Sequence, residues 1–90
     1  MDIQTKIVDL ISSALDDSSI SIESTNENVT AWDSLGHLSI LSALDGATDG
    51  KVSEIRDFND VSSVIQIVRL FEEFNLDLWD LQKSLKILAP

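Results

Sequence analysis

Apolar residues recur at intervals of three and four positions along most of this 90-residue chain, and this spacing constrains its fold more than any other feature. They mark one face of a helix over residues 3–15, at Ile3, Ile7, Leu10, Ile11 and Ala14. The same spacing returns in residues 35–45, 61–74 and 76–88, whereas alternation typical of a strand is confined to residues 20–22. The sequence therefore predicts an all-α fold.

A long polar connection separates the first two helical segments. It follows the run Asp16-Asp17-Ser18-Ser19, whose side chains compete for backbone hydrogen bonds and are expected to end the first helix. A loop of this length in a compact domain needs anchors. We expect four apolar side chains to hold it against the core: Ile20, Ile22, Val29 and Trp32.

The tripeptide Asp33-Ser34-Leu35 stands where this connection meets the second helical segment. Asp33 is predicted to cap the helix by accepting a hydrogen bond from a backbone N–H of its first turn. The Ser34 hydroxyl would then lie on the surface at the positive end of the helix dipole, where a phosphate ester is favoured.

A helix that begins with Asp33-Ser34-Leu35, in a small and acidic helical chain, resembles the acyl carrier proteins over roughly residues 3–72. In that family the serine carries 4′-phosphopantetheine, transferred from coenzyme A by a holo-carrier synthase (a phosphopantetheinyl transferase). The thiol of this arm holds acyl groups as thioesters and delivers them to acyl-transferring or ligating enzymes. The resemblance implies that this chain is a non-catalytic carrier with Ser34 as its attachment site.

The resemblance also implies a four-helix bundle with a short third helix. Ser53 to Asp57 fits the third helix, with Ser53 as its cap. A fourth helix is predicted from Val61 to about Phe74, capped by Asn59-Asp60.

Residues 76–90 continue beyond the usual end of such a bundle and are predicted to form an additional C-terminal helix with Asp77 as its cap. We divide the chain into a bundle over residues 1–75 and an extension over residues 76–90 packed on the same domain. The extension either covers the fourth helix or docks a partner through Trp79.

Two further sets of residues follow from the resemblance. The candidate acyl-chain pocket consists of Leu41, Leu44, Ile55 and Val61. The candidate partner-docking face consists of Leu35, His37, Leu38 and Asp45. Fatty-acid carriers usually place several acidic residues along the second helix, whereas this chain has Gly36, His37, Ser39 and Ser42 there. The sequence therefore predicts a dedicated carrier for a specialised pathway.

His37 is the only histidine in the chain and lies three residues after Ser34. This spacing allows a Ser–His enzyme, but no glycine-rich nucleophile turn precedes Ser34. We therefore expect His37 to be an exposed residue of the docking face. No catalytic residue and no metal site is predicted, since the acidic pairs at 16–17 and 72–73 are typical of solvated helix ends.

The net charge of −10 disfavours nucleic acid as a partner. Residues 1–50 hold nine acidic residues and one basic residue, a net charge of −8, and residues 51–90 carry −2. This charge favours basic protein patches or serves solubility alone. The chain has no cysteine, no secretory signal and no stretch long enough to span a membrane, so we expect a cytoplasmic protein. We also expect it to be a monomer.

Two alternatives remain open at this point. An aminoacyl or peptidyl carrier would share Ser34 and differ only in its pocket. A helical protein-interaction adaptor would have the same bundle without a prosthetic group.

Overall fold

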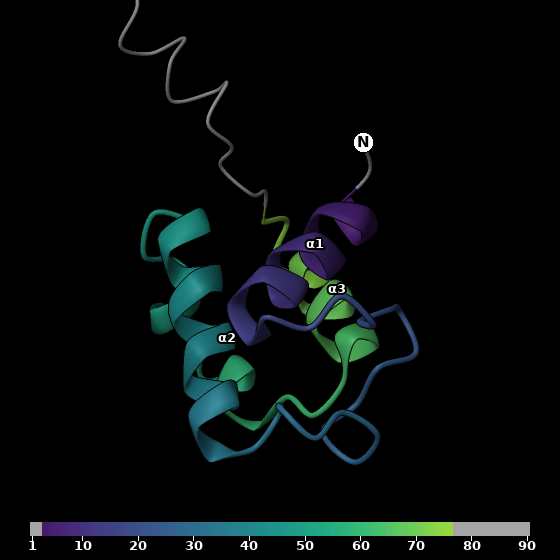
Figure 1. Ribbon diagram of the computed structural model, residues 1–90. Helices are drawn as coiled ribbons and strands as arrows, with labels where there is room; N and C mark the ends of the chain where they lie inside the picture. Colours follow the sequence, from purple (N-terminus) through teal and green to yellow (C-terminus); the bar gives the residue numbers. More distant parts are fainter. Residues whose placement is uncertain (1–2, 77–90) are drawn as a thin grey trace, which may run out of the picture.

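The computed structural model describes residues 3–76, and helices make up most of their regular structure (Figure 1). There are three α-helices in this range: α1 (Ile3–Leu15), α2 (Ser34–Ala47) and α3 (Val64–Glu73). Two short 3-10 helices, η1 (Val52–Glu54) and η2 (Arg56–Asp60), lie between α2 and α3. Residues 3–76 contain no strand, so the all-α prediction is confirmed.

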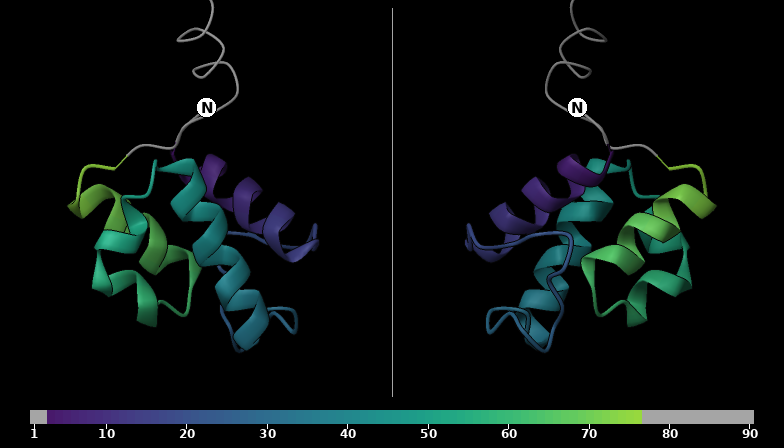
Figure 2. Two further views of the ribbon diagram at one scale, coloured as in Figure 1. Left: turned by 90° about the vertical axis from the view of Figure 1, so that its left-hand side faces the viewer. Right: turned by 90° about the vertical axis from the view of Figure 1, so that its right-hand side faces the viewer.

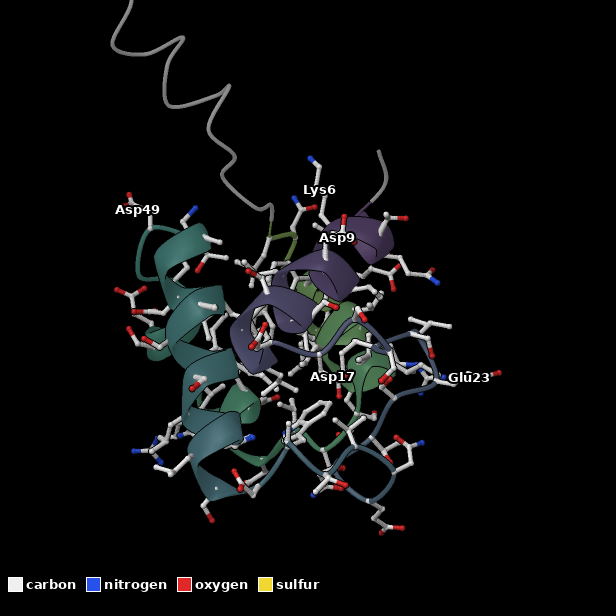
Figure 3. The ribbon with its side chains drawn as sticks, viewed as in Figure 1. Lys6, Asp9, Asp17, Glu23 and Asp49 are labelled. Carbon is white, nitrogen blue, oxygen red and sulfur yellow. The ribbon has the colours of Figure 1, made fainter. Side chains whose placement is uncertain are left out.

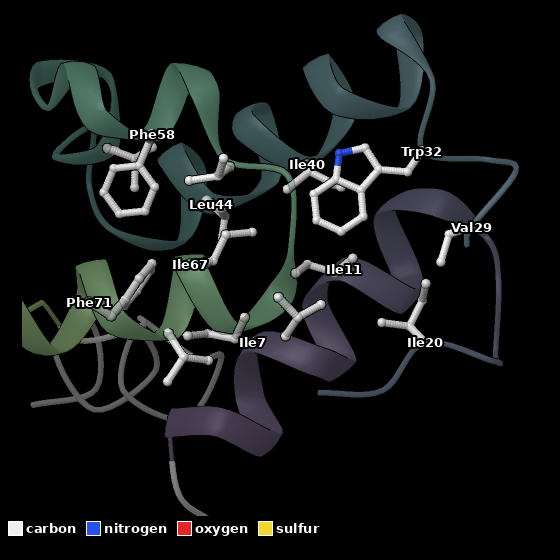
Figure 4. Packing of buried hydrophobic residues seen from close by; sticks show 14 residues of the cluster. Ile7, Ile11, Ile20, Val29, Trp32, Ile40, Leu44, Phe58, Ile67 and Phe71 are labelled. Atoms are coloured by element: carbon white, nitrogen blue, oxygen red, sulfur yellow. The ribbon is translucent and has the colours of Figure 1, made fainter. Parts of the chain in front are cut away.

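The helices enclose one hydrophobic core. α1 packs against both α2 and α3, while η1 contacts α2 and η2 contacts α3 (Figure 2). Their apolar side chains meet in the interior, where Phe58 and Phe71 form an edge-to-face pair with ring centroids 5.7 Å apart (Figure 4). The largest fully buried apolar side chains come from all three α-helices and from η2: Ile7, Ile11, Ile40, Leu44, Phe58, Val64, Ile67 and Phe71.

α1 has the predicted bounds and the predicted inner face. Ile7 and Ile11 are fully buried. The helix ends at a Schellman motif, in which Asp16 adopts a left-handed conformation with φ of 52° and the Asp17 amide donates to the Ser12 carbonyl at 3.0 Å. The run of short polar residues after Leu15 therefore ends the helix as predicted.

The connection between α1 and α2 is held by apolar side chains in the core and by backbone hydrogen bonds to the segment before α3. Ile20, Val29 and Trp32 are buried and Ile22 is half-buried, as the sequence predicts. The backbone of this loop also pairs with the segment before α3 through an isolated antiparallel bridge between Thr25 and Ser63. Beside the bridge, the Asn26 amide donates to the Ser62 carbonyl at 2.8 Å, and the Val64 amide donates to the Ser24 carbonyl at 3.0 Å.

This pairing explains why the prediction for the start of the last described helix was wrong. α3 begins at Val64 rather than Val61, and its cap is Ser63 rather than Asn59-Asp60. The Ser63 hydroxyl accepts from the Gln66 amide at 3.2 Å, and Gln66 Oε1 accepts from the Ser62 amide at 2.7 Å. Because Ser62 and Ser63 are bonded to the loop, this part of the chain stays extended.

The predicted third helix over residues 53–57 is also corrected. The chain forms η1 and η2 instead, with Ile55 extended between them at φ −112° and ψ 108°. Ser53 is no cap of an α-helix, since its amide donates to Asp45 Oδ1 at 2.8 Å and its hydroxyl donates to the Gly50 carbonyl at 2.9 Å. The break at Ile55 allows both Val52 and Phe58 to be buried in the core.

The predicted C-terminal helix falls on residues 76–90, of which only Leu76 belongs to the described part of the chain. Leu76 is half-buried and packs against the core. The other residues of the predicted extension, Trp79 included, lie outside the described residues.

Candidate functional site

Ser34 is the first residue of α2 and is exposed to solvent. Its hydroxyl makes no hydrogen bond within residues 3–76. The side chain therefore has the surface position predicted for it, at the positive end of a 14-residue helix.

Asp33 forms the predicted cap beside it. The backbone of Asp33 is extended, with φ −95° and ψ −165°, and its carboxylate accepts from the Gly36 amide at 2.9 Å. The Asp33 carbonyl accepts from the His37 amide at 2.7 Å. In the first turn, the amides of Ser34 and Leu35 have no partner among the described residues, as expected for a helix N-terminus.

Gly36 allows the loop to cross close to this first turn. A Cβ atom built on Gly36 would lie 1.9 Å from the Ala31 carbonyl oxygen and 3.1 Å from Leu15 Cδ2. Gly36 is buried, so it does not belong to the docking face on which the resemblance to acyl carrier proteins had placed it. No acidic side chain could occupy this position without moving the loop.

His37 is half-buried rather than exposed, which corrects the expectation for this residue. Its Nδ1 accepts a hydrogen bond from Trp32 Nε1 at 3.3 Å, and its Nε2 lies 2.9 Å from the Asn59 carbonyl oxygen. Both ring nitrogens are therefore engaged, and neither bonds the Ser34 hydroxyl. The arrangement does not form the Ser–His pair of a nucleophilic enzyme.

An open groove of about 650 Å³ lies beside Ser34. Its walls come from the loop before α2, from the first turns of α2, from the end of η2 and from the segment that follows η2. The lining residues are Asn26, Trp32, Asp33, Ser34, His37, Leu38, Asn59, Asp60, Val61 and Ser62. The groove places polar amide and hydroxyl groups opposite Ser34, together with the apolar side chains of Leu38 and Val61.

The predicted docking residues separate into two groups. Leu35 and Leu38 are 75% and 61% exposed, which makes them accessible to a partner. Asp45 is half-buried, and its carboxylate accepts from the Ser53 amide, so part of its role is to hold η1 against α2.

Other acidic side chains are spread over the molecule, as Figure 3 shows for Asp9 on α1 and Asp49 after α2.

The four predicted pocket residues lie in different places within residues 3–76. Leu41 lines a second open groove, of about 300 Å³, between α2 and η1. Leu44 is fully buried in the core, Val61 lines the groove beside Ser34, and Ile55 is half-buried against the core. Two of the four residues therefore line different grooves and two lie in or against the core, and a shared acyl-chain pocket stays a prediction.

Three residues of the site were missed at the level of sequence. Trp32 was expected only as a loop anchor, Asn59 as a helix cap and Gly36 as a surface position. Their roles depend on contacts between segments up to 22 residues apart, and no local pattern marks them. The one available signal was the short spacing between Trp32 and His37, a donor and an acceptor that a helix start can bring together.

Comparisons with protein-family models, with curated proteins and with solved structures give no match to this chain. Among residues 3–76, no helix is long and apolar enough to cross a membrane. The same residues contain no cluster of three or more histidine and acidic side chains arranged to hold a metal ion.

Proposed function

We propose that this protein is a carrier that holds acyl intermediates as thioesters on a 4′-phosphopantetheine arm attached to Ser34. The observation that carries the proposal is the environment of the Ser34 hydroxyl. It is exposed, it begins a capped helix, and it has no hydrogen-bond partner within residues 3–76. The tripeptide Asp33-Ser34-Leu35 adds the resemblance to acyl carrier proteins.

The residues around Ser34 fit a phosphodiester on its oxygen. The amides of Ser34 and Leu35 are unpaired in the described chain and can donate to phosphate oxygens. The Asp33 carboxylate is held by the Gly36 amide, which keeps it bonded within the first turn. The dipole of α2 adds a favourable field for an anion at this end.

Attachment requires a separate transferase, which removes the Ser34 proton. The Ser34 oxygen then attacks the β-phosphorus of coenzyme A, a new O–P bond forms, and the bond between that phosphorus and the bridging oxygen breaks. Adenosine 3′,5′-bisphosphate leaves with the electron pair. The attached arm supplies a terminal thiol that forms thioesters with acyl groups.

In this proposal α1, α2 and α3 are the long helices of a carrier-like bundle, and η1 with η2 replaces its short third helix. Leu35 and Leu38 flank Ser34 on the exposed side of α2 and are the proposed contacts for the transferase and for acyl-transferring or ligating enzymes. The exposed residues Ser39 and Ser42 take the place of acidic residues on this helix, which supports a dedicated role in a specialised pathway.

The proposal is tested by measuring the intact mass after incubation with coenzyme A and a broad-specificity phosphopantetheinyl transferase. We expect the wild-type protein to gain the mass of one phosphopantetheine group and Ser34→Ala to gain none. Ser39→Ala is the matched control, because Ser39 is another exposed serine of α2 and its loss should leave the modification unchanged.

A wild-type protein that gains no mass would overturn the proposal and leave the helical adaptor as the better interpretation. If the arm is attached, the mass of the cargo on protein isolated from its source distinguishes an acyl group from an amino acid.

A further inference from the structure

The two hydrogen bonds of His37 select one form of its imidazole ring. The Trp32 indole N–H can only donate, so Nδ1 of His37 must carry a lone pair. The Asn59 carbonyl can only accept, so Nε2 must carry the proton. Only the neutral ring protonated on Nε2 satisfies both partners. We call the pair of hydrogen bonds from Trp32 through His37 to Asn59 the His37 bridge.

The His37 bridge connects three segments of the chain. Trp32 belongs to the loop before α2, and its ring is directed at Ile11 and Ile40 in the core (Figure 4). His37 lies in the first turn of α2, and Asn59 lies in η2. The backbone of η2 packs against η1 and α3 rather than closely against α2. The bond between His37 and Asn59 therefore supplies a direct link between the start of α2 and η2.

The same three residues line the groove beside Ser34. The bridge therefore belongs to the wall of the groove and links the loop to η2, and His37 lies one helical turn from Ser34. A shift of η2 away from α2 would widen the groove and release the Trp32 ring edge. A fixed bridge keeps the surface around the Ser34 hydroxyl in one arrangement.

We propose that His37, protonated on Nε2, is a positioning residue that holds the groove wall beside Ser34 and so favours productive approach of the transferase to the Ser34 hydroxyl. This inference rests on the proposed function for its last step. Formation of the bridge itself does not depend on that function, and its signature can be measured separately.

The first measurement is the tautomer of His37, read from long-range ¹H–¹⁵N spectra of the apo protein near neutral pH. Because His37 is the only histidine, its signals need no assignment among several rings. We expect a single tautomer protonated on Nε2 in the wild-type protein. In Trp32→Phe the indole donor is lost while the Asn59 carbonyl still accepts from Nε2, so we expect the same tautomer and a changed ¹⁵N chemical shift of Nδ1, whose lone pair no longer accepts a hydrogen bond. A mixture in the wild-type protein would overturn the bridge.

The second measurement is the steady-state rate of modification of Ser34, with the carrier as the varied substrate. We expect His37→Leu to lower kcat/KM by about fivefold to tenfold, mainly through KM, as for the loss of one or two positioning hydrogen bonds. His37→Gln retains one acceptor and one donor and should recover part of this loss. Ser13→Ala, which removes an exposed hydroxyl from α1, should match the wild-type protein.

The outcomes separate the two proposals. If the wild-type protein is modified and folded His37→Leu is modified at the same kcat/KM, the positioning role is wrong and the proposed function stands. If the wild-type protein is not modified at all, both the proposed function and the positioning role are wrong, even when the tautomer is the expected one. If His37→Gln has a higher kcat/KM than His37→Leu while its melting temperature is no higher, the difference in rate does not come from stability. That result supports positioning over a purely structural effect.

Discussion

The backbone of Gly36 lies so close to the Ala31 carbonyl oxygen that a methyl group at this position would overlap it. Replacing Gly36 by Ala should therefore destabilise the protein, although alanine favours helices more than glycine does. We expect the free energy of unfolding to fall by about 2 kcal/mol, as for overpacking of a closely packed site. Chemical denaturation followed by circular dichroism measures this change.

Gly46 provides the control for this prediction, because it lies in the same helix and a Cβ atom there meets nothing within 4 Å. Gly46→Ala should raise the free energy of unfolding by up to about 1 kcal/mol through helix propensity alone. If both substitutions change stability in the same direction, the close approach of Ala31 to α2 is not a feature of the folded protein.

Asp17 illustrates an effect of local hydrogen bonding on a charge. The Ser19 hydroxyl and the Ser19 amide both donate to Asp17 Oδ1, at 2.5 Å and 2.9 Å. The side-chain bond, and then the backbone bond, lower the pKa of Asp17 below its ordinary value, since they favour the ionised carboxylate. Because the folded state binds this proton less tightly than the unfolded state, the stability contributed by Asp17 is present above the unfolded pKa and is lost as the pH falls through the folded pKa.

Removing the hydroxyl donor should raise the pKa of Asp17. In Ser19→Ala the NMR titration of the Asp17 carboxyl carbon should shift toward the ordinary range, and the loss of stability on acidification should be smaller. Ser18→Ala is the matched control, because Ser18 is also exposed and makes no such bond. An identical Asp17 titration in both variants would contradict this assignment.

At the scale of the element, each α-helix of the described chain is followed by a residue in the left-handed region. These residues are Asp16, Asp49 and Asn75, with φ of 52°, 58° and 56°. After α2 the Gly50 amide donates to the Asp45 carbonyl at 2.9 Å, which satisfies one of the last free carbonyls of the helix. Asp and Asn tolerate this conformation better than most residues, but glycine adopts it without a Cβ penalty.

We therefore expect Asp49→Gly to stabilise the protein by about 0.5 to 1 kcal/mol. Asp49→Asn separates the two causes, because it removes the negative charge from the C-terminal end of α2 and leaves a side chain that tolerates positive φ. Asp49→Ala should be destabilising relative to Asp49→Asn. Thermal unfolding of the three variants measures the order, and a protein with alanine at least as stable as that with glycine would contradict it.

At the scale of the whole molecule, Phe58 connects the 3-10 helix η2 to the hydrophobic core. It is fully buried in η2 and packs edge-to-face on Phe71 of α3. The short 3-10 helices have few hydrogen bonds of their own, so their position depends on side chains such as Phe58 and Val52. Loss of this ring affects the wall of the groove as well as the core, since Asn59 follows it directly.

Phe58→Ala should lower the free energy of unfolding by about 3 to 5 kcal/mol, a large part of the stability of a small domain. Phe74→Ala removes the same side chain from a position that is 42% exposed and should cost far less. Urea denaturation compares the two midpoints. Equal costs would show that η2 is not anchored through Phe58.

The periodic spacing of apolar residues determined the all-α class, the bounds of α1 and the start of α2. Ile7 and Ile11 in α1 follow a helical repeat that only a helix can bury on one side. Asp33 caps α2 through contacts within four residues, so local chemistry was sufficient to place Ser34 at the helix start. The anchors Ile20, Val29 and Trp32 were also predictable, because a long loop can be held only by its few apolar side chains.

Tertiary contacts decided the start of α3, the division of the third helix into η1 and η2, and the environment of His37. Backbone hydrogen bonds with Ser24 and Asn26 of the first loop hold the chain before α3 extended, so the helix begins only after Ser63. The spacing of Ser63 and Gln66 is that of a capping box, and this local pattern could have indicated the start of the helix. The His37 bridge joins segments 22 residues apart, and its partner Asn59 is a backbone carbonyl that any residue type could supply. The spacing of apolar residues determines which side chains one helix can bury. The hydrogen bonds at Ser62, Val64 and His37 depend instead on which distant backbone groups meet in the folded chain.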